Sequence, residues 1–318
     1  MNFDIDYERE FDPPRHAKPK KTAAKKKPVV KQSYESNAEV QRWLQEQALD
    51  ATGHKPPFEP ALLASLRERD WLLSSLTHFY EQDLITDVLN VAKSGKEATV
   101  YCCAADPSTG LAYLAAKIYR PRMFRSLKND AIYRESREQR DRQGRVRRDR
   151  GVQSNSLTEG ERAARVASWI AYEFETQRRL HTAGGDVPRT LAQVGNAVLM
   201  EYVGDAKTPA PRLSELELAP DEARPLFEQL LRNVELFLAH DRIHGDLSAY
   251  NILYWNGEVT IIDFAQAVDP RYNDAIYPLL ERDVDRLCRY FAPYGVAADA
   301  ARIASDMWTR YLIGELLL

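Results

Sequence analysis

Asp246, Asn251 and Asp263 have side chains and a spacing that suit phosphoryl transfer. Two β-type runs, ILYW and EVTII, flank Asn256-Gly257, which is the strongest short signal for a β-hairpin. A hairpin centred on this turn places Asn251 opposite Ile262 and therefore beside Asp263. An amide oxygen and a carboxylate held together suit Mg²⁺. Asp246, on the loop before the hairpin, is then placed to accept a proton from a nucleophile.

Taken singly, these residues also have ordinary structural interpretations. Asp246 caps a turn and Asp263 caps a strand end in the simplest alternative. The spacing H-x-D-x-x-x-x-N, followed by an aspartate after the next strand, favours the catalytic interpretation for the set. His244 is expected to shape the loop through hydrogen bonds and not to act as an acid or base.

Lys117 lies in the apolar strand sequence AAKIY, where an unpaired charge is costly. Glu173 is the natural partner, because it stands seven residues after Val166 on the inner face of a helix expected over 161–183. Such an ion pair would hold the lysine against nucleotide phosphates. The alternative is a lysine at the strand end that faces outward.

Two further segments are candidates for nucleotide binding. A backbone turn that covers phosphates is expected at the sequence SGKE, although one glycine makes neither G-x-G-x-x-G nor a Walker loop. The extended segment 200–203, expected at the end of a short strand that follows Asn196, offers backbone groups for an adenine edge. The residues concerned are Ser94, Gly95, Lys96 and Glu97 in the turn and Met200, Glu201 and Val203 in the extended segment.

The elements that must position these residues follow from hydrophobic periodicity. Three β-type runs, 84–93, 98–105 and 111–119, predict an antiparallel meander whose second connection is the turn sequence DPSTG. The helix over 161–183 and two short strands around Gly195-Asn196 complete a small lobe. A second lobe consists of an amphipathic helix over 220–241, the hairpin and a helical tail from Tyr277.

The predicted fold class is therefore α+β, with a small antiparallel sheet lobe, a helical lobe and a helical N-terminal extension. This is the outline of a two-lobed phosphotransferase. The predicted division is a disordered basic tail (1–35), the helical extension (36–82), an N-lobe (83–203) with a mobile Arg-rich insertion (120–160), and a C-lobe (204–318).

Composition narrows the class of protein. The 318 residues include 44 Lys+Arg and 47 Asp+Glu, for a net charge of −3. Residues 13–34 carry +8 and residues 120–151 carry +7, which leaves −18 on the remainder. The basic segments either keep the chain soluble or contact nucleic acid or another anionic partner. Three cysteines without zinc spacing, a polar acidic start and no long apolar run predict a cytoplasmic protein without membrane contact.

The motifs SGKEATVY, AAKIYR, VLMEYVG, HGDLSAYN and IIDFAQAV, in this order, resemble the RIO family of atypical serine/threonine protein kinases. The resemblance covers about residues 80–290. It implies a kinase-like fold without the usual activation loop, and the use of ATP with Mg²⁺, for which Mn²⁺ substitutes. Ser248 stands where ordinary protein kinases have a lysine, so neutralisation of the γ-phosphate must come from elsewhere.

The resemblance also implies a role for each matching residue. Lys117 and Glu173 would act on the phosphates, Asp246 would accept the proton, and Asn251 and Asp263 would bind Mg²⁺. The backbone at Glu201 and Val203 would contact adenine. In this family the aspartate that matches Asp263 is also phosphorylated, which adds an ATPase cycle to the expected activities.

Three functions are compatible with these residues and with the resemblance. The first is a protein kinase that phosphorylates serine or threonine of a protein substrate, itself included. The second is a small-molecule phosphotransferase of the aminoglycoside or choline type, which also uses HGDxxxxN. The sequences SGKEATVY and DFAQAV argue against this second function. The third is an ATP-gated assembly factor that binds ribosomal or other RNA–protein particles through the basic segments. The first and third are compatible in one protein.

Overall fold

The computed structural model describes residues 56–60, 62, 69–95, 97–120, 139–140, 146–147, 159–272 and 276–316. All elements described below belong to the unit formed by residues 33–318. The predicted basic tail (1–35) and most of the helical extension (36–82) lie outside the described residues. The predicted domain boundaries therefore remain predictions.

The N-terminal part of the described chain is built on one antiparallel sheet of order β1-β2-β3-β7-β6. The first three strands pair as the predicted meander, which is confirmed. Asp106 caps a 3₁₀ turn and Gly110 (φ 73°) reverses the chain between the second and third strands. The strands are β1 (Ile85–Ser94), β2 (Ala98–Ala105), β3 (Tyr113–Tyr119), β6 (Thr190–Val194) and β7 (Ala197–Glu201).

Successive side chains of β3 point to opposite faces of the sheet, and a different helix packs on each face. Leu114, Ala116 and Ile118 join a buried cluster with α2 (Arg69–Glu81). Ala115 and Tyr119 join a second cluster with α5 (Glu159–Thr182). Lys117 shares the alternation of this second set, so the strand period alone turns it toward α5.

Between β3 and α5 the described residues form only a two-stranded ribbon. It pairs β4 (Gln139–Arg140) with β5 (Val146–Arg147) in antiparallel fashion. The rest of the predicted insertion (120–160), from residue 121 up to the start of α5, lies outside the described residues, and its mobility remains a prediction.

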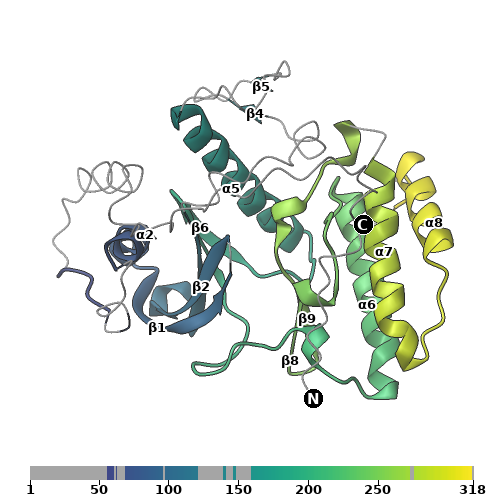
Figure 1. The fold of residues 1–318 in the computed structure, drawn as a ribbon, viewed down its shortest axis with the longest axis horizontal. Helices are drawn as coiled ribbons and strands as arrows, with labels where there is room; N and C mark the ends of the chain where they lie inside the picture. The colour runs from purple at the N-terminus through teal and green to yellow at the C-terminus, as the bar shows by residue number, and fades with distance from the viewer. Residues whose placement is uncertain are drawn as a thin grey trace, which may run out of the picture. The chain divides into compact units, whose positions relative to one another are not determined.

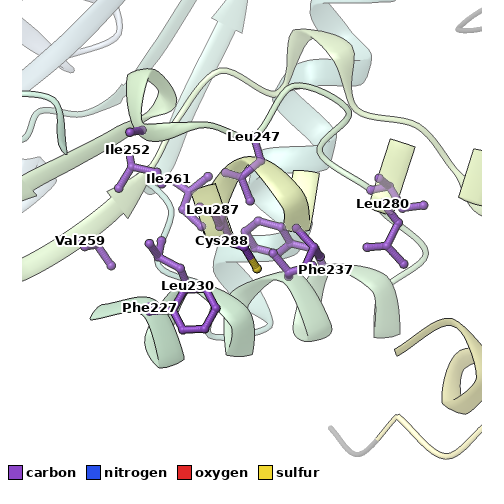
Figure 2. Packing of buried hydrophobic residues seen from close by; sticks show 14 of the residues in the cluster. Phe227, Leu230, Phe237, Leu247, Ile252, Val259, Ile261, Leu280, Leu287 and Cys288 are labelled. Carbon is purple, nitrogen blue, oxygen red and sulfur yellow. The ribbon is translucent and has the colours of Figure 1, made fainter. Parts of the chain in front are cut away.

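The C-terminal part packs helices against a β-hairpin. The helices are α6 (Pro220–Ala239), α7 (Tyr277–Phe291) and α8 (Ala300–Leu312), which run alongside one another in Figure 1. The hairpin strands are β8 (Ile252–Trp255) and β9 (Glu258–Ile261). One hydrophobic cluster joins these helices to the hairpin, and Figure 2 shows residues of α6, α7 and both strands within it, with Leu247 directed into the cluster.

The hairpin has the predicted register. Asn256 (φ 53°) and Gly257 (φ 87°) are both left-handed, as a two-residue turn of this type requires. Trp255 pairs with Glu258. The N–H of Ile262 donates to the carbonyl of Asn251 at 2.9 Å, so Asn251 lies opposite Ile262 and next to Asp263, as predicted.

Short 3₁₀ helices complete the described chain, at Pro107–Thr109, Leu213–Glu215, Ala249–Asn251, Phe264–Gln266, Pro270–Tyr272 and Ala292–Tyr294. In the part of the chain that the structure describes, no helix has the length and apolar character needed to cross a bilayer.

Candidate active site

Lys117 and Glu173 form the ion pair that the sequence predicts. Nζ of Lys117 lies 2.7 Å from Oε1 of Glu173, whose side chain is only 4% exposed. The hydroxyl of Tyr119 donates to Oε2 of Glu173, and the ring of Tyr119 lies 5.1 Å from the same Nζ. Both carboxylate oxygens of Glu173 therefore have donors, which a buried charge requires. The outward-facing alternative for Lys117 is excluded.

Asp263 is the second anion on Lys117, at 3.0 Å from Nζ. Burial by itself lowers the pKa of Lys117, but the carboxylates of Asp263 and Glu173 outweigh it and hold that pKa well above its usual range. The charge of Lys117, opposed by burial, lowers the pKa of Asp263. The site therefore holds a protonated lysine between two carboxylates.

The backbone of Asp263 is left-handed (φ 71°), a conformation that costs a non-glycine residue about 1–3 kcal/mol. Contacts with α5 hold Asp263 in this conformation. The following 3₁₀ turn is tied to α5, because the indole N–H of Trp169 donates to the carbonyl of Ala265 at 3.1 Å. The carboxylate of Asp263 is 46% exposed, so it is open to a ligand from solvent.

The loop that carries Asp246 is fixed on both sides by α7. The carboxylate of Asp283 accepts from the N–H of Gly245 at 2.7 Å and from that of Leu247 at 3.0 Å. Arg282 donates to the carbonyl of Gly245. Gly245 is left-handed (φ 77°), and a Cβ there would lie 2.4 Å from the carbonyl oxygen of Gln266. Only glycine fits this position without a shift of the backbone.

His244 has the structural role that the sequence predicts. The N–H of Asp246 donates to its Nδ1 at 3.3 Å, so the ring proton is on Nε2, which lies 3.1 Å from the carbonyl of Ile262. Burial is the main cause that lowers the pKa of His244. A neutral His244 thus joins the loop to the open end of the hairpin.

Asp246 and Asn251 lie together in this loop. Nδ2 of Asn251 donates to the carbonyl of Asp246 at 2.9 Å, which leaves the amide oxygen as the atom available to a cation. With the carboxylate of Asp263 it makes a two-oxygen donor set, suited to Mg²⁺, which keeps water and phosphate as its other ligands. Among the described residues no three His, Cys, Asp or Glu side chains gather as a closed metal site. The donors present fit Mg²⁺.

The turn predicted to cover phosphates is present between β1 and β2. The N–H of Gly95 donates to the carbonyl of Ala98 at 2.9 Å. Arg120 holds both sides of the turn, because its guanidinium donates to Oγ of Ser94 and to Oγ1 of Thr99, each at 2.9 Å. Lys96 lies outside the described residues.

The pKa of Glu97 responds to the charges of Asp263 and Lys117. Its pKa is raised by burial and by the negative charge of Asp263, and the positive charge of Lys117 opposes this. The backbone carbonyl of Glu97 accepts from the N–H of Arg120 at 2.7 Å. The charges of Asp263 and Lys117 therefore act on the carboxyl group of Glu97 in this turn.

The segment that ends β7 and continues to Val203 has the extended form expected of it. Met200 is buried with Ala115 in the cluster beside α5. The N–H of Glu201 donates to the carbonyl of Arg189 at 2.8 Å, and the carbonyl of Val203 accepts from Ala210 at 3.0 Å. The N–H of Val203 has no backbone partner within the described residues, and it remains a donor for a ligand.

Sequence reasoning missed the residues that support the loop. Arg286 of α7 contacts Asp246 directly, with Nη1 at 2.7 Å from Oδ1. Asp283 was also not predicted, nor were two residues elsewhere in the site: Tyr119, which donates to Glu173, and Arg120, which holds the turn between β1 and β2. A signal existed for Asp283, since an acid at a buried helical position between Leu280 and Leu287 needs a partner. For Arg286 the sequence pattern contains no such signal.

Comparisons with known proteins agree with this geometry. The family model of the RIO domain matches residues 99–303. The chain is 31% identical over 138 residues to the RIO-type serine/threonine-protein kinase Rio1 of Thermoplasma acidophilum, covering 43% of this chain and 71% of that one. It is 28% identical over 220 residues to human serine/threonine-protein kinase RIO1, covering 69% of this chain. It is 30% identical over 138 residues to RIO1 of Caenorhabditis elegans, covering 43% of this chain.

The chain spans 36% of the human relative and 27% of the nematode relative. Its fold matches a crystal structure of the Rio2 kinase–ADP/Mg²⁺–phosphoaspartate complex from Chaetomium thermophilum. The TM-score is 0.53 at 18% identity, with 86% of this chain and 87% of that one covered. The predicted two-lobed α+β fold is thus confirmed. Because the family model covers well over half of its residues, the chain belongs to the RIO domain family.

Proposed function

We propose that this protein is an ATP- and Mg²⁺-dependent phosphotransferase of RIO type that phosphorylates serine or threonine of proteins, itself included. The observation that carries the proposal is the meeting of Lys117, Glu173 and Asp263 in one ion cluster. The names of the relatives as serine/threonine-protein kinases support it. The same family membership argues against the small-molecule alternative.

In this proposal Lys117, oriented by Glu173, binds the phosphates of ATP. Asn251 and Asp263 would hold Mg²⁺, which would supply neutralisation of phosphate charge; Mn²⁺ would substitute for it. Asp246 accepts the proton of the acceptor hydroxyl. The hydroxyl oxygen forms a bond to the γ-phosphorus, the bond from that phosphorus to the bridging oxygen breaks, and ADP leaves.

The remaining predicted residues would hold the nucleotide. The turn of Ser94, Gly95, Lys96 and Glu97 would cover the phosphates with backbone N–H groups. Met200 would line the adenine pocket, and backbone groups of Glu201 and Val203 would bond the adenine edge. The partners we propose are a protein substrate in the cytoplasm and, through basic segments 13–34 and 120–151, an RNA–protein particle such as a ribosomal precursor.

The exposed carboxylate of Asp263 favours a second activity at the same site. In it, an oxygen of Asp263 bonds to the γ-phosphorus and ADP leaves, and water then cleaves the aspartyl phosphate to release phosphate and restore the carboxylate. The Rio2 kinase from Chaetomium thermophilum, whose fold matches, was solved as a phosphoaspartate complex. The protein would then act as an ATPase that drives its own release from a particle.

One labelling experiment tests both activities. The purified protein is incubated with γ-labelled ATP and Mg²⁺, beside Asp246→Ala and Asp263→Ala. Acid-stable label on protein, absent from both variants, is expected for serine or threonine transfer. Label that hydroxylamine removes, together with free phosphate, is expected for the aspartyl-phosphate cycle. An intact protein that neither binds nor turns over ATP would contradict the proposed function.

A further inference from the structure

Helix α7 contacts the loop of Asp246 in two different ways. Arg282 and Asp283 hold its backbone, through the carbonyl of Gly245 and the N–H groups of Gly245 and Leu247. Arg286, one helical turn further on, instead contacts the carboxylate of Asp246 with Nη1 at 2.7 Å from Oδ1. The backbone contacts fix the path of the loop, whereas the Arg286 contact fixes the side chain.

The Arg286 contact is not needed to hold the helix or the loop in place. The side chain of Arg286 is 37% exposed and that of Asp246 is 49% exposed. An exposed ion pair contributes only about 0–1 kcal/mol to stability. The burial of Val284, Leu287 and the neighbouring core residues, together with the bonds of Asp283, anchors α7 without Arg286.

Arg286 also supplies a positive charge that the loop of Asp246 itself lacks. The loop 245–251 contains no Lys or Arg. Lys117 is already paired with Glu173 and Asp263, and His244 is neutral. In the described part of the chain, Arg286 is the cationic side chain that pairs with Asp246.

We propose that Arg286 is a positioning residue for the transfer step: it binds Oδ1 of Asp246 and thereby presents Oδ2 to the acceptor hydroxyl. Oδ2 is otherwise approached by Nδ2 of Asn251 at 3.4 Å, a distance too long for a strong hydrogen bond. The proton of the hydroxyl passes to Oδ2 as the hydroxyl oxygen bonds to the γ-phosphorus, the bond from that phosphorus to the bridging oxygen breaks, and ADP leaves. This inference rests on the proposed function, because Arg286 acts through Asp246, the base of that function.

The first test compares Arg286→Gln and Arg286→Lys with a matched control on the same helix. Arg289→Gln is that control, because Arg289 is 79% exposed and its ion-pair partner within the described residues is Asp285, on the same helix. A misplaced base costs on the order of 10- to 100-fold in rate. We expect Arg286→Gln to lower kcat for protein phosphorylation by about that factor with the KM for ATP unchanged, Arg286→Lys to recover part of the rate, and Arg289→Gln to match the wild type.

The second test is a double-mutant cycle with Asp246→Asn. If Arg286 acts through Asp246, then Arg286→Gln slows the wild type but has no further effect on the residual rate of Asp246→Asn. A purely structural role would slow both backgrounds equally, lower the affinity for an ATP analogue and lower the thermal midpoint of Arg286→Lys as well. Any of these three results would overturn the inference.

The two proposals fail in different ways. Full activity of Arg286→Gln beside a strongly slowed Asp246→Asn overturns the role of Arg286 and leaves the proposed function intact. A wild-type protein without phosphoryl transfer, or an Asp246→Asn variant as fast as the wild type, overturns the proposed function and the inference with it.

Discussion

The ammonium group of Lys117 on β3 lies 3.0 Å from the carboxylate of Asp263, the second residue after β9. These two residues are 146 positions apart in the chain. Glu173 on α5 completes the cluster at 2.7 Å from the same ammonium group. One cation thus connects the sheet, the long helix and the end of the hairpin, and the site exists only when all three are in place.

Removing Lys117 is expected to destabilise the fold as well as stop catalysis. Lys117→Met leaves the buried carboxylate of Glu173 without its cation, and breaking a buried ion pair in this way costs about 3–5 kcal/mol. Denaturant unfolding measures the loss. The double variant Lys117→Met, Glu173→Gln removes both charges and is expected to regain part of the stability without activity. A single variant as stable as the wild type would contradict this account of the pair.

Replacing Asp283 is expected to loosen the loop of Asp246. Asp283→Asn offers one acceptor oxygen where two backbone N–H groups now donate, so one buried donor loses its partner at a cost of about 1–3 kcal/mol. The free energy of unfolding and the transfer rate should both fall. Asp285→Asn on the same helix is the control, because its i,i+4 pair with Arg289 is exposed and contributes little. Equal losses in the two variants would refute the role of Asp283.

Glycine is required at position 245 for two reasons that a pair of variants separates. Gly245→Ala combines a left-handed backbone (φ 77°) with a Cβ 2.4 Å from the carbonyl oxygen of Gln266. Gly257→Ala has a similar backbone (φ 87°) but open space around the Cβ. We expect Gly257→Ala to cost about 1–2 kcal/mol and Gly245→Ala clearly more, with loss of activity. Thermal unfolding of both variants checks the order, and the reverse order would contradict it.

The neutral state of His244 predicts a dependence of stability on pH. Burial lowers its pKa in the folded protein below the ordinary value of 6.5. The unfolded chain therefore binds the proton first, and stability is lost as the pH falls from about 6.5 toward the folded pKa, with a slope of up to about 1.4 kcal/mol per pH unit. His244→Asn keeps an acceptor near the N–H of Asp246 but does not titrate. Denaturant unfolding between pH 5 and pH 7 should show a shallower slope for this variant, and identical slopes would exclude His244 as the cause.

Sequence alone determined the parts of the site that depend on local pattern. The turn Asn256-Gly257 sets the hairpin register, because two left-handed residues allow only one pairing of the flanking runs. The two-residue period of β3 sets the face of Lys117. The helical period that makes Val166 an inner residue does the same for Glu173, so the sequence pattern by itself predicts the partner of Lys117.

The tertiary structure decided what local periodicity does not encode. Asp283 and Arg286 reach the loop of Asp246 from a helix 36 to 40 residues further along the chain. The contact between Lys117 and Asp263 requires the sheet and the hairpin to meet, and the left-handed backbone of Asp263 is held by packing against α5. Periodicity determines which face of an element is buried. Only the packing of one element on another determines which polar groups then meet, because that depends on the distances and angles between elements remote in sequence.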